Sequence, residues 1–486
     1  MTPRRTSPLV LLVHTITFKQ ARSWVPLALF VLATRGFDGG PGTIVALVVA
    51  VTALSLATAL VGWWRFSYAD GPTSVVVTRG LLSRSVRTVP NDRIRGVEVE
   101  APPLHRLFGL VRVRIDAAAG GGGRPGQEEE LVVDGVRPAE GDRLRAHLLG
   151  ARRSAAPDGS TADDAVPAPP PEEVVARLDH RWLLYAPLVG SYLAVPLAAV
   201  GALFRVLDEL PEGWQPRVGR PGVPDGALVA GLLVAAVVVL AVGAVVGSAL
   251  VNWRFRVVRR GGSLIASRGL LTRRHTELEI DRIRGCTVTD GVGMRLVRAA
   301  RTTALVTGLG DAARRGQVLP LGPRPVAYAL ATRLVADPGP LAAHPPAARR
   351  RRLVRAVAPG AAVLVAGGVL TAVLGWWPVL AAGAALTALG VPLGLARYAA
   401  LGHAAGPRSF AVRGGWLVRT HVLLERRAVV GWRVRQSAVQ RWSGLASVEA
   451  CVGAGTGGYT AVDMAAGEVA GFARAASGSW ADALQR

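Results

Sequence analysis

Six mostly apolar stretches predict membrane-spanning helices arranged in three pairs. They lie at residues 23–34, 43–62, 182–204, within 226–253, and in the two halves of 356–396. Crossing a bilayer takes about 20 apolar residues. The last stretch has 41 residues without a charge, so it predicts a hairpin of two spans that turns at residues 375–378. The first stretch is shorter, and we interpret it as a span because it completes the first pair.

The pattern after the first pair changes to that of short β-strands. β-branched residues dominate 73–78, and apolar and polar residues alternate through 94–100 and 110–115. We expect strands at residues 73–78, 81–89, 94–100, 110–115 and 131–133, a loop at 120–130 and a closing helix at 138–149. A second closing helix is expected at 324–335. Short antiparallel strands followed by one helix predict an α+β fold, a small barrel capped by its C-terminal helix.

This strand region occurs three times along the chain. A shift of 189 positions places Trp64–Phe66 on Trp253–Phe255 and the motif Asp92–Gly96 on Asp281–Gly285 without a gap. A shift of 335 positions reveals a fainter third copy. In it, Gly80, Arg84, Gly96, Val99, Arg106, Gly109 and Leu110 fall on Gly415, Arg419, Gly431, Val434, Arg441, Gly444 and Leu445. The spacing is too wide for a solenoid, so we predict three homologous domains, each preceded by a pair of spans.

The pairs, the repeats and two Pro- and Ala-rich connectors predict the division of the chain. The parts are an N-terminal segment with the first span pair (1–64), domain 1 (65–150), a linker (151–180), the second pair (181–253), domain 2 (254–335), a basic linker (336–355), the third pair (356–397), a divergent domain 3 (398–476) and a tail (477–486).

Charge predicts which side of the membrane the domains occupy. The chain has a net charge of +24 and a mean hydropathy of +0.34, while the loops inside the three span pairs are nearly neutral. Positive residues stay in the cytoplasm, so all three domains are expected on the cytoplasmic side of the cytoplasmic membrane. The same rule explains the arginines without a nucleic-acid partner. Two cysteines, Cys286 and Cys451, are too few for a disulfide framework or a metal cluster.

The run TRGLLSRSVRTVPNDRIRGVEVEAPPLHRLFGLVRVRI, placed directly after a span pair, resembles the bacterial pleckstrin-homology-like (PH-like) domain of YdbS/YdbT-type membrane proteins. The resemblance implies PH-like barrels on the cytoplasmic face and a general association with envelope stress and resistance to antimicrobial peptides. It covers the first two copies well. In the third copy Arg427, Ala428 and Val429 replace the Asp-Arg-Ile core, and in the second Arg298 stands at the position of Gly109.

Two groups of residues are candidate sites. The first is basic and suits anionic lipid headgroups or an acidic partner, since each basic residue near an anionic surface contributes roughly 1 kcal/mol. It consists of Arg79, Arg84, Arg87, Arg268, Arg273, Arg274, Arg413 and Arg419. The second is the repeat motif Asp92, Arg93, Arg95 and Gly96, with Asp281, Arg282, Arg284 and Gly285. For the motif we favour a structural role, in which the Asp accepts turn hydrogen bonds, over ligand binding.

An apolar patch in the first copy also has two interpretations. Leu104, Leu107, Phe108 and Leu110 are answered by Val439, Trp442 and Leu445 in the third copy. Core packing at a turn between strands is the default interpretation. Contact with the membrane surface or with a neighbouring domain is the alternative.

The chain has no sequence motif of an enzyme. The eight histidines are scattered, without His-Glu-x-x-His, and the Gly120–Gly123 run lacks the Gly-Lys-Ser/Thr of a phosphate loop. We therefore expect no catalytic residue, cofactor or metal. The sequence predicts a binding or scaffold protein of the inner membrane face, with membrane lipid and a membrane protein as candidate partners and the homo-oligomeric state open. The alternative is a component of a transport or export complex whose spans form a pathway.

Overall fold

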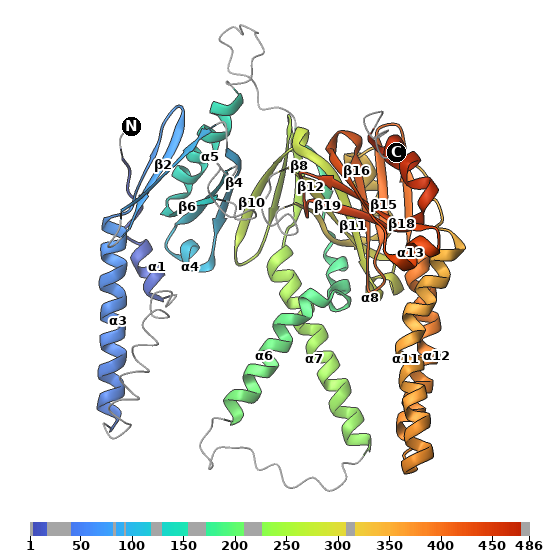
Figure 1. The fold of residues 1–486 in the computed structure, drawn as a ribbon. Coiled ribbons are helices and arrows are strands. Elements are labelled where there is room, and N and C mark those ends of the chain that lie inside the picture. The colour runs from blue at the N-terminus through green and yellow to red at the C-terminus, as the bar shows by residue number, and fades with distance from the viewer. Residues whose placement is uncertain are drawn as a thin grey trace. The chain divides into compact units, whose positions relative to one another are not determined.

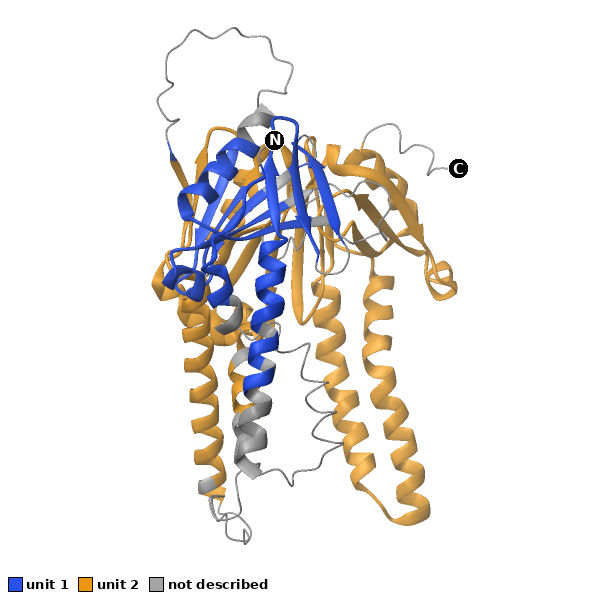
Figure 2. Ribbon diagram, turned by 90° about the vertical axis from the view of Figure 1, so that its left-hand side faces the viewer, with its two compact units in different colours: residues 1–172, 263–277 blue, residues 173–262, 278–486 orange. Residues whose placement is uncertain are grey.

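The computed structural model describes residues 3–16, 40–80, 84–91, 94–117, 129–153, 172–208, 226–307 and 316–477. The chain divides into two compact units, which Figure 2 shows in different colours: residues 1–172 and 263–277 form unit 1, and residues 173–262 and 278–486 form unit 2. Unit 1 therefore contains the first copy of the repeat and two strands of the second. Unit 2 contains the rest of the second copy and the whole of the third.

The first copy consists of two sets of three antiparallel strands and a closing helix (Figure 1). Its elements are β1 (Ser67–Asp70), β2 (Ser74–Arg79), β3 (Ser85–Pro90), β4 (Ile94–Ala101), β5 (Val111–Ala117), β6 (Glu129–Val136) and α5 (Pro138–Arg153). The first set has the order β1-β2-β3, and β4, β5 and β6 are neighbours in the second. The five predicted strands and the closing helix are confirmed. β1 has four residues and no alternating pattern, so the sequence did not reveal it.

Side chains from both sheets and from α5 meet in one apolar core. Val75 and Val77 of β2, Ile115 of β5, and Leu144 and Leu148 of α5 are all buried. Val76, between these two valines of β2, is less buried than they are, which is the period of two that predicted the strand. Burying each such side chain contributes about 1.5–3 kcal/mol, so the core holds the two sheets together although they belong to different hydrogen-bonded ladders.

The second and third copies have the same order of elements. The second contains β8 (Arg256–Arg260), β9 (Ser263–Arg268), β10 (Arg273–Glu279), β11 (Ile283–Gly291), β12 (Ala299–Val306), β13 (Gln317–Pro323) and α10 (Arg324–Leu334). The third contains β14 (Gly402–Ala405), β15 (Ser409–Gly414), β16 (Val418–Glu425), β17 (Val429–Arg435), β18 (Leu445–Val452), β19 (Gly458–Ala465) and α14 (Val469–Ser477). An additional strand, β7 (Glu173–Arg177), pairs with β8 in unit 2.

Hydrogen-bonded strands join each copy to the next. In unit 1, β4 pairs antiparallel with β10, and Glu100 lies opposite Arg274. In unit 2, β11 pairs antiparallel with β16, and Thr289 lies opposite Thr420. The fourth strand of a copy thus extends the first sheet of the following copy instead of closing on its own third strand. The prediction of closed barrels is wrong for this reason: the sheets stay open and are shared between copies.

Three helices in the described part of the chain are long and apolar enough to cross a membrane, not the six predicted. They are α7 (Gly226–Asn252), α11 (Pro346–Leu374) and α12 (Pro378–Ala399), all in unit 2. A fourth is present if η2 (His180–Leu188) and α6 (Gly190–Asp208), bent by 75°, count as one span. In α3 (Gly40–Trp64), only Thr52–Trp64 qualifies as an apolar helix, and it is shorter than a span. The span predicted at 23–34 lies outside the described residues.

The break in the predicted span at 182–204 has a local cause. Residues up to Leu188 form a 3₁₀ helix that begins where the carboxylate of Asp179 accepts a hydrogen bond from the backbone N–H of Arg181. Pro187 cannot donate a backbone hydrogen bond, and Val189 adopts an extended conformation. The α-helix restarts only at Gly190, so the apolar run is continuous in sequence but not in structure.

Glycines allow α11 and α12 to pack tightly against each other. A Cβ atom on Gly367 would lie 2.4 Å from the backbone nitrogen of Leu380, and one on Gly383 would lie 2.4 Å from Cα of Leu364. Small residues at such contacts are typical of helix pairs in membranes. At the turn, Gly375 has φ of 67° and its N–H caps α11 at the carbonyl of Thr371. The predicted helical hairpin is confirmed.

Candidate membrane-facing site

A helix of five residues follows the fourth strand in each copy. We call these the tip helices: α4 (Pro103–Leu107), α8 (Val292–Leu296) and α13 (Ala438–Trp442). They occupy the same repeat positions, since shifts of 189 and 335 residues carry Leu107 onto Leu296 and Trp442. A helix of this length is too short to give a periodic pattern, and the sequence alone did not reveal it.

The last residue of each tip helix is apolar and exposed. Leu107, Leu296 and Trp442 are 74%, 81% and 88% exposed. In the described part of the chain, no large apolar side chain is more exposed than those of Trp442 and Leu296. The preceding residue is an arginine in every copy. Each tip therefore presents an apolar side chain beside a cation, the combination that suits a membrane interface.

The third residue from the end anchors the tip helix to its own copy. In copy 1, Nε2 of His105 lies 2.7 Å from Oδ1 of Asp134, whose other oxygen accepts from Arg112 at 2.8 Å. In copy 3, the side-chain amide of Gln440 donates to Oδ1 of Asp463 at 2.8 Å. The equivalent residue of copy 2, Met294, is an apolar side chain that is 1% exposed. Three different side chains thus fix the same short helix.

The first tip helix packs beside the end of α3 in unit 1. Leu104 and Phe108 contact an apolar cluster with Val10, Val13 and Leu110 at its centre and Trp63 at its edge. The indole N–H of Trp63 donates to the carbonyl of Thr6 at 3.0 Å. Leu104 and Leu110 of the predicted patch are therefore packed, as the default interpretation expected, whereas Leu107 is exposed.

The second tip helix lies against η2, immediately before α6 begins. A Cβ atom on Gly293 would be 3.2 Å from Cβ of Leu188, so α8 approaches this segment closely. Leu188 is the last residue of η2, and α6 starts two residues later. In copy 2, as in copy 1, the tip helix lies where the chain passes between a β domain and an apolar helix.

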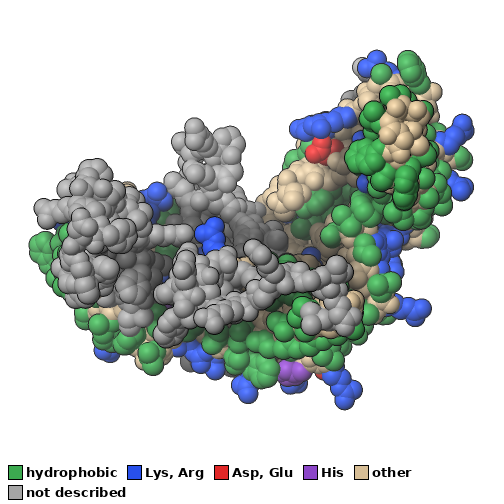
Figure 3. Space-filling view, turned by 90° about the horizontal axis from the view of Figure 1, so that it is seen from below, with side chains coloured by type: hydrophobic (Ala, Val, Ile, Leu, Met, Phe, Trp, Pro, Cys, Tyr) green, Lys and Arg blue, Asp and Glu red, His purple; other side chains and the backbone are tan. Residues whose placement is uncertain are grey.

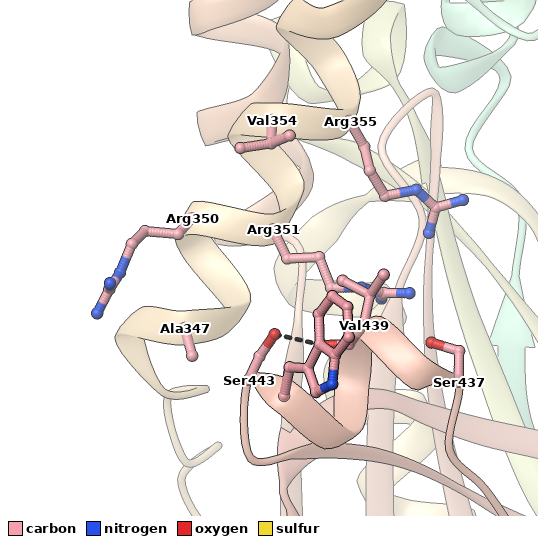
Figure 4. A pocket seen from close by; sticks show the side chains of 9 residues that line it. Ala347, Arg350, Arg351, Val354, Arg355, Ser437, Val439 and Ser443 are labelled. Carbon is pink, nitrogen blue, oxygen red and sulfur yellow. Dashed lines mark hydrogen bonds between the residues drawn. The ribbon is translucent and has the colours of Figure 1, made fainter.

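The third tip helix lines a cavity of about 720 Å³ with the first turns of α11. Its wall includes Arg350, Arg351 and Arg355 from α11 and Val439 and Trp442 from α13. Figure 4 shows Arg351 and Arg355 extending towards the α13 side, whereas Arg350 points the other way. An open cavity with cations on one wall and apolar groups on the other can hold an anionic headgroup beside acyl chains.

A buried carboxylate connects this cavity to the third copy. Asp463 is completely buried and pairs with Arg351 and, at 2.7 Å, with Arg352. The same carboxylate accepts the hydrogen bond from Gln440. Asp463 has φ of 62°, a left-handed conformation that is rare for a residue with a side chain. One side chain therefore fixes both the start of α11 and the tip helix α13.

Two buried histidines lie behind Asp463. Nδ1 of His344 is 3.0 Å from the backbone carbonyl of Asp463, and its Nε2 is 3.2 Å from Nδ1 of His403. Burial, together with the smaller effect of the neighbouring His344, lowers the pKa of His403 to about 4. Burial also lowers the pKa of His344. Both rings are therefore neutral at physiological pH.

The basic candidates do not gather into one site. Arg79, Arg84, Arg87 and Arg273 are exposed on strands or at their ends, and Arg268 is half-buried. Nε of Arg274 lies 3.2 Å from Oε1 of Glu100 across the β4–β10 pair. Arg413 donates to the carbonyls of Ala399, Ala400 and Leu401 at the end of α12, and Arg419 lies opposite Asp290 between β16 and β11. Arg274, Arg413 and Arg419 thus have structural positions.

The repeat motif lies at the start of the strand that joins the copies. Asp92 and Arg93 are outside the described residues, and Arg95 and Gly96 are described only as backbone of β4. In copy 2, Arg282 pairs with Glu279 at 2.9 Å, and Arg284 donates to the backbone carbonyl of Asp281 at 2.6 Å. The carboxylate of Asp281 is exposed. A Cβ atom on Gly285 would lie 2.5 Å from the carbonyl oxygen of Leu423 on β16, so the motif glycine admits the neighbouring strand.

Comparison with known proteins agrees with this threefold organisation. A family model described as Bacterial PH domain matches residues 23–152, 197–336 and 354–475, one segment for each copy. UPF0699 transmembrane protein YdbT of Bacillus subtilis (strain 168) is 22% identical over 271 residues, which is 53% of this chain and 52% of that protein. The chain thus spans about half the length of this curated relative. No solved structure matches the chain.

Proposed function

Because the chain belongs to the bacterial PH domain family, whose model matches most of its length, we propose that it is a binding module of the inner membrane face. In this proposal the domains lie in the cytoplasm and the tip helices dip into the interface of the bilayer that the apolar helices cross. Its role is binding and scaffolding, in the setting of envelope stress, rather than catalysis. Each copy has an exposed apolar residue at the end of its tip helix and an arginine before it. Such residues suit binding to a surface, not catalysis.

The equivalent placement of Leu107, Leu296 and Trp442 carries the proposal. Moving a side chain of this size out of water contributes about 1.5–3 kcal/mol. A basic residue near an anionic leaflet adds about 1 kcal/mol. Tryptophan in particular favours the headgroup region. On the face seen from below in Figure 3, the visible side chains are mostly apolar or basic and few are acidic.

Fluorescent labelling in lipid nanodiscs tests the depth of the tips. Cys286 and Cys451 are replaced by Ala, and Leu107→Cys, Leu296→Cys and Trp442→Cys are labelled one at a time with an environment-sensitive dye. All three labels should emit at shorter wavelength than in water and be quenched by doxyl lipids. The control is Thr456→Cys, an exposed site beyond the far end of β18 from α13, about 25 Å away by strand length. Tips that behave like the Thr456 label would refute membrane insertion.

The cavity beside α11 is the proposed headgroup site. We expect the variant Arg355→Ala to retain several-fold less anionic phospholipid than the wild type when native mass spectrometry measures bound lipid. The matched control is Arg408→Ala, which removes one arginine from the wall of another cavity in the same copy. An equal loss of lipid in both variants would show nonspecific surface attraction instead of a headgroup site.

A further inference from the structure

Two outer strands lack, in the described part of the chain, the neighbour that their equivalents have in other copies. β3 is one of the two outer strands of β1-β2-β3 in the first copy, and β17 is one of the two outer strands of β17-β18-β19 in the third. The equivalents of β3 in the later copies are β10 and β16. The equivalents of β17 in the earlier copies are β4 and β11. These four strands form the two junctions between copies, so each unpaired edge is one half of a junction that the chain already uses twice.

Both internal junctions have the same register. Val99 lies opposite His275 in the first, and Val288 lies opposite His421 in the second. These pairs are the same repeat positions, related by the shifts of 189 and 335 residues. The same correspondence places Val434 of β17 opposite Val86 of β3.

Exposure separates the internal strands from the unpaired edges. Val288 in the second junction is 2% exposed, whereas Val434 is 43% and Val86 is 52% exposed. Val430, also on β17, is 74% exposed. An edge strand with exposed apolar residues and free backbone groups is a template for another strand.

The third copy retains the junction glycine, although no strand in the described part of the chain pairs with the junction edge of β17. Gly285 lies so close to β16 that a Cβ atom would be 2.5 Å from the carbonyl oxygen of Leu423. Gly431 is the equivalent residue of copy 3, and nothing lies within 4 Å of a Cβ atom built there. No contact in the described part of the chain requires a glycine at 431, whereas an added strand in the shared register would.

The arginine of the tip helix also distinguishes the two internal junctions from the third copy. Arg106 donates to the backbone carbonyl of Leu270 at 2.6 Å, in the turn between β9 and β10. Arg295 donates to the carbonyl of Trp416, the equivalent turn residue of copy 3. Arg441 is exposed, and the described residues contain no partner for its guanidinium. Among the three tip-helix arginines, Arg441 is thus the one without a junction partner in the described part of the chain.

We propose that β17 of one chain pairs with β3 of a second copy of this chain, in the register of the internal junctions. The contact is head-to-tail, because two different strands form it. Every chain keeps its apolar helices in one membrane, so successive chains are related by rotation about the membrane normal. Such a contact gives a ring when the rotation closes.

The proposed junction is weaker than the internal ones. Its register places Arg433 of β17 opposite Arg87 of β3, and like charges in this position are unfavourable. Glu449 on β18 partly compensates, since its carboxylate lies 3.4 Å from Arg433. By contrast, Glu100 faces Arg274 in the first junction. Association between chains is therefore expected to be reversible and to depend on protein density in the membrane.

Disulfide cross-linking of two differently tagged full-length chains tests the contact. In the background without Cys286 and Cys451, one chain carries Val86→Cys and the other Val434→Cys, and both are expressed together. Opposed residues of antiparallel strands have Cα atoms about 4.5–5.5 Å apart, which suits a disulfide. We expect at least a fivefold stronger mixed-tag dimer band than for the control pair Val86→Cys with Val430→Cys. That control uses the more exposed valine of the same strand, displaced by four residues.

Two further variants decide the register without depending on cysteine chemistry. Arg87→Glu should increase the oligomeric fraction at low density, because it places a carboxylate opposite Arg433. Gly431→Val should decrease that fraction and leave the thermal unfolding temperature of the chain unchanged, because its Cβ has open space in the single chain. Equal cross-linking in the test and control pairs, or oligomerisation indifferent to both variants, would overturn the proposal.

Discussion

At the scale of single residues, the position after the tip helix keeps the same backbone conformation in all three copies, although its residue type changes. Gly109 and Gly444, which follow the first and third tip helices, have φ of 63° and 64°. Arg298 occupies the same position in copy 2 and has φ of 52°. The sequence showed the replacement of glycine but not its consequence. The structure shows that the turn keeps its left-handed shape, at a cost of about 1–2 kcal/mol for a residue with a Cβ atom.

Arg298→Gly should therefore stabilise the protein. The relief of backbone strain exceeds the greater flexibility of glycine in the unfolded chain, so we expect a gain of about 0.5–1 kcal/mol. Thermal unfolding in detergent measures it as a higher midpoint. Arg259→Gly, at an exposed side chain of β8 with an ordinary extended backbone, is the control and should lower the midpoint. A lower midpoint for both variants would mean that Arg298 makes interactions worth more than its strain.

At the scale of elements, local pattern predicted strands but not their partners. β2, β4 and β5 follow the alternation of apolar and polar residues, and α5 follows its apolar stripe through Leu144 and Leu148. The tip helices were missed because five residues make barely more than one turn. Pairing of β4 with β10 was missed because pairing depends on residues far apart in the chain, and alternation carries no information about them. The glycine at this position in all three copies was seen only as a repeat residue, and the close approach of β16 to Gly285 gives its physical reason in the second copy.

The packing of α11 against the third copy should weaken in mild acid. His403 has a pKa lowered to about 4, whereas an unfolded histidine has an ordinary pKa near 6.5. Between these values the unfolded chain binds a proton that the folded chain does not, so stability falls as pH drops from 6.5 towards 4. The contribution of His403 is on the order of 2 kcal/mol.

Unfolding midpoints measured from pH 7 to pH 4 check this contribution. His403→Gln retains a polar side chain that does not titrate, and it should make the midpoint less dependent on pH. Part of the dependence should remain, because burial also lowers the pKa of His421 to about 4. His180→Gln, at an exposed histidine of η2, is the matched control and should leave the wild-type dependence unchanged. An unchanged slope in His403→Gln would assign the acid sensitivity to other groups.

At the scale of the whole molecule, the sequence predicted the number of copies and their order, but it predicted more spans than the described part of the chain contains. Three β domains with closing helices occur where the repeat placed them. An uncharged run is a poor guide to a span when a residue such as Pro187 interrupts the helix, because composition alone does not show the break. Closed barrels were predicted by treating each copy as self-sufficient, whereas the copies share their sheets. Within each unit, a hydrogen-bonded strand pair therefore joins successive copies: β4 with β10 in unit 1, and β11 with β16 in unit 2.

The charges at the two ends of α11 predict the topology of the chain in the membrane. Five arginines lie at positions 349–355 of α11, whereas the turn from Gly375 to Trp377 carries no charge. Basic residues remain on the cytoplasmic side, so the turn should lie outside the cell and the β domains inside. In the background without native cysteines, Trp376→Cys should react with a membrane-impermeant maleimide in intact cells. Trp376 is 56% exposed at that turn.

Thr456→Cys tests the other side of the membrane, where the predicted topology requires no labelling in intact cells. It lies in the exposed turn between β18 and β19 of the third copy, and it should react only after the membrane is disrupted. Labelling of Thr456→Cys in intact cells would place the β domains outside. The tip helices would then face the outer leaflet, and the anionic lipid of the cytoplasmic leaflet would be excluded as their ligand. A single pair of labelling experiments thus connects the direction of one helical hairpin to the leaflet that we propose for the three tip helices.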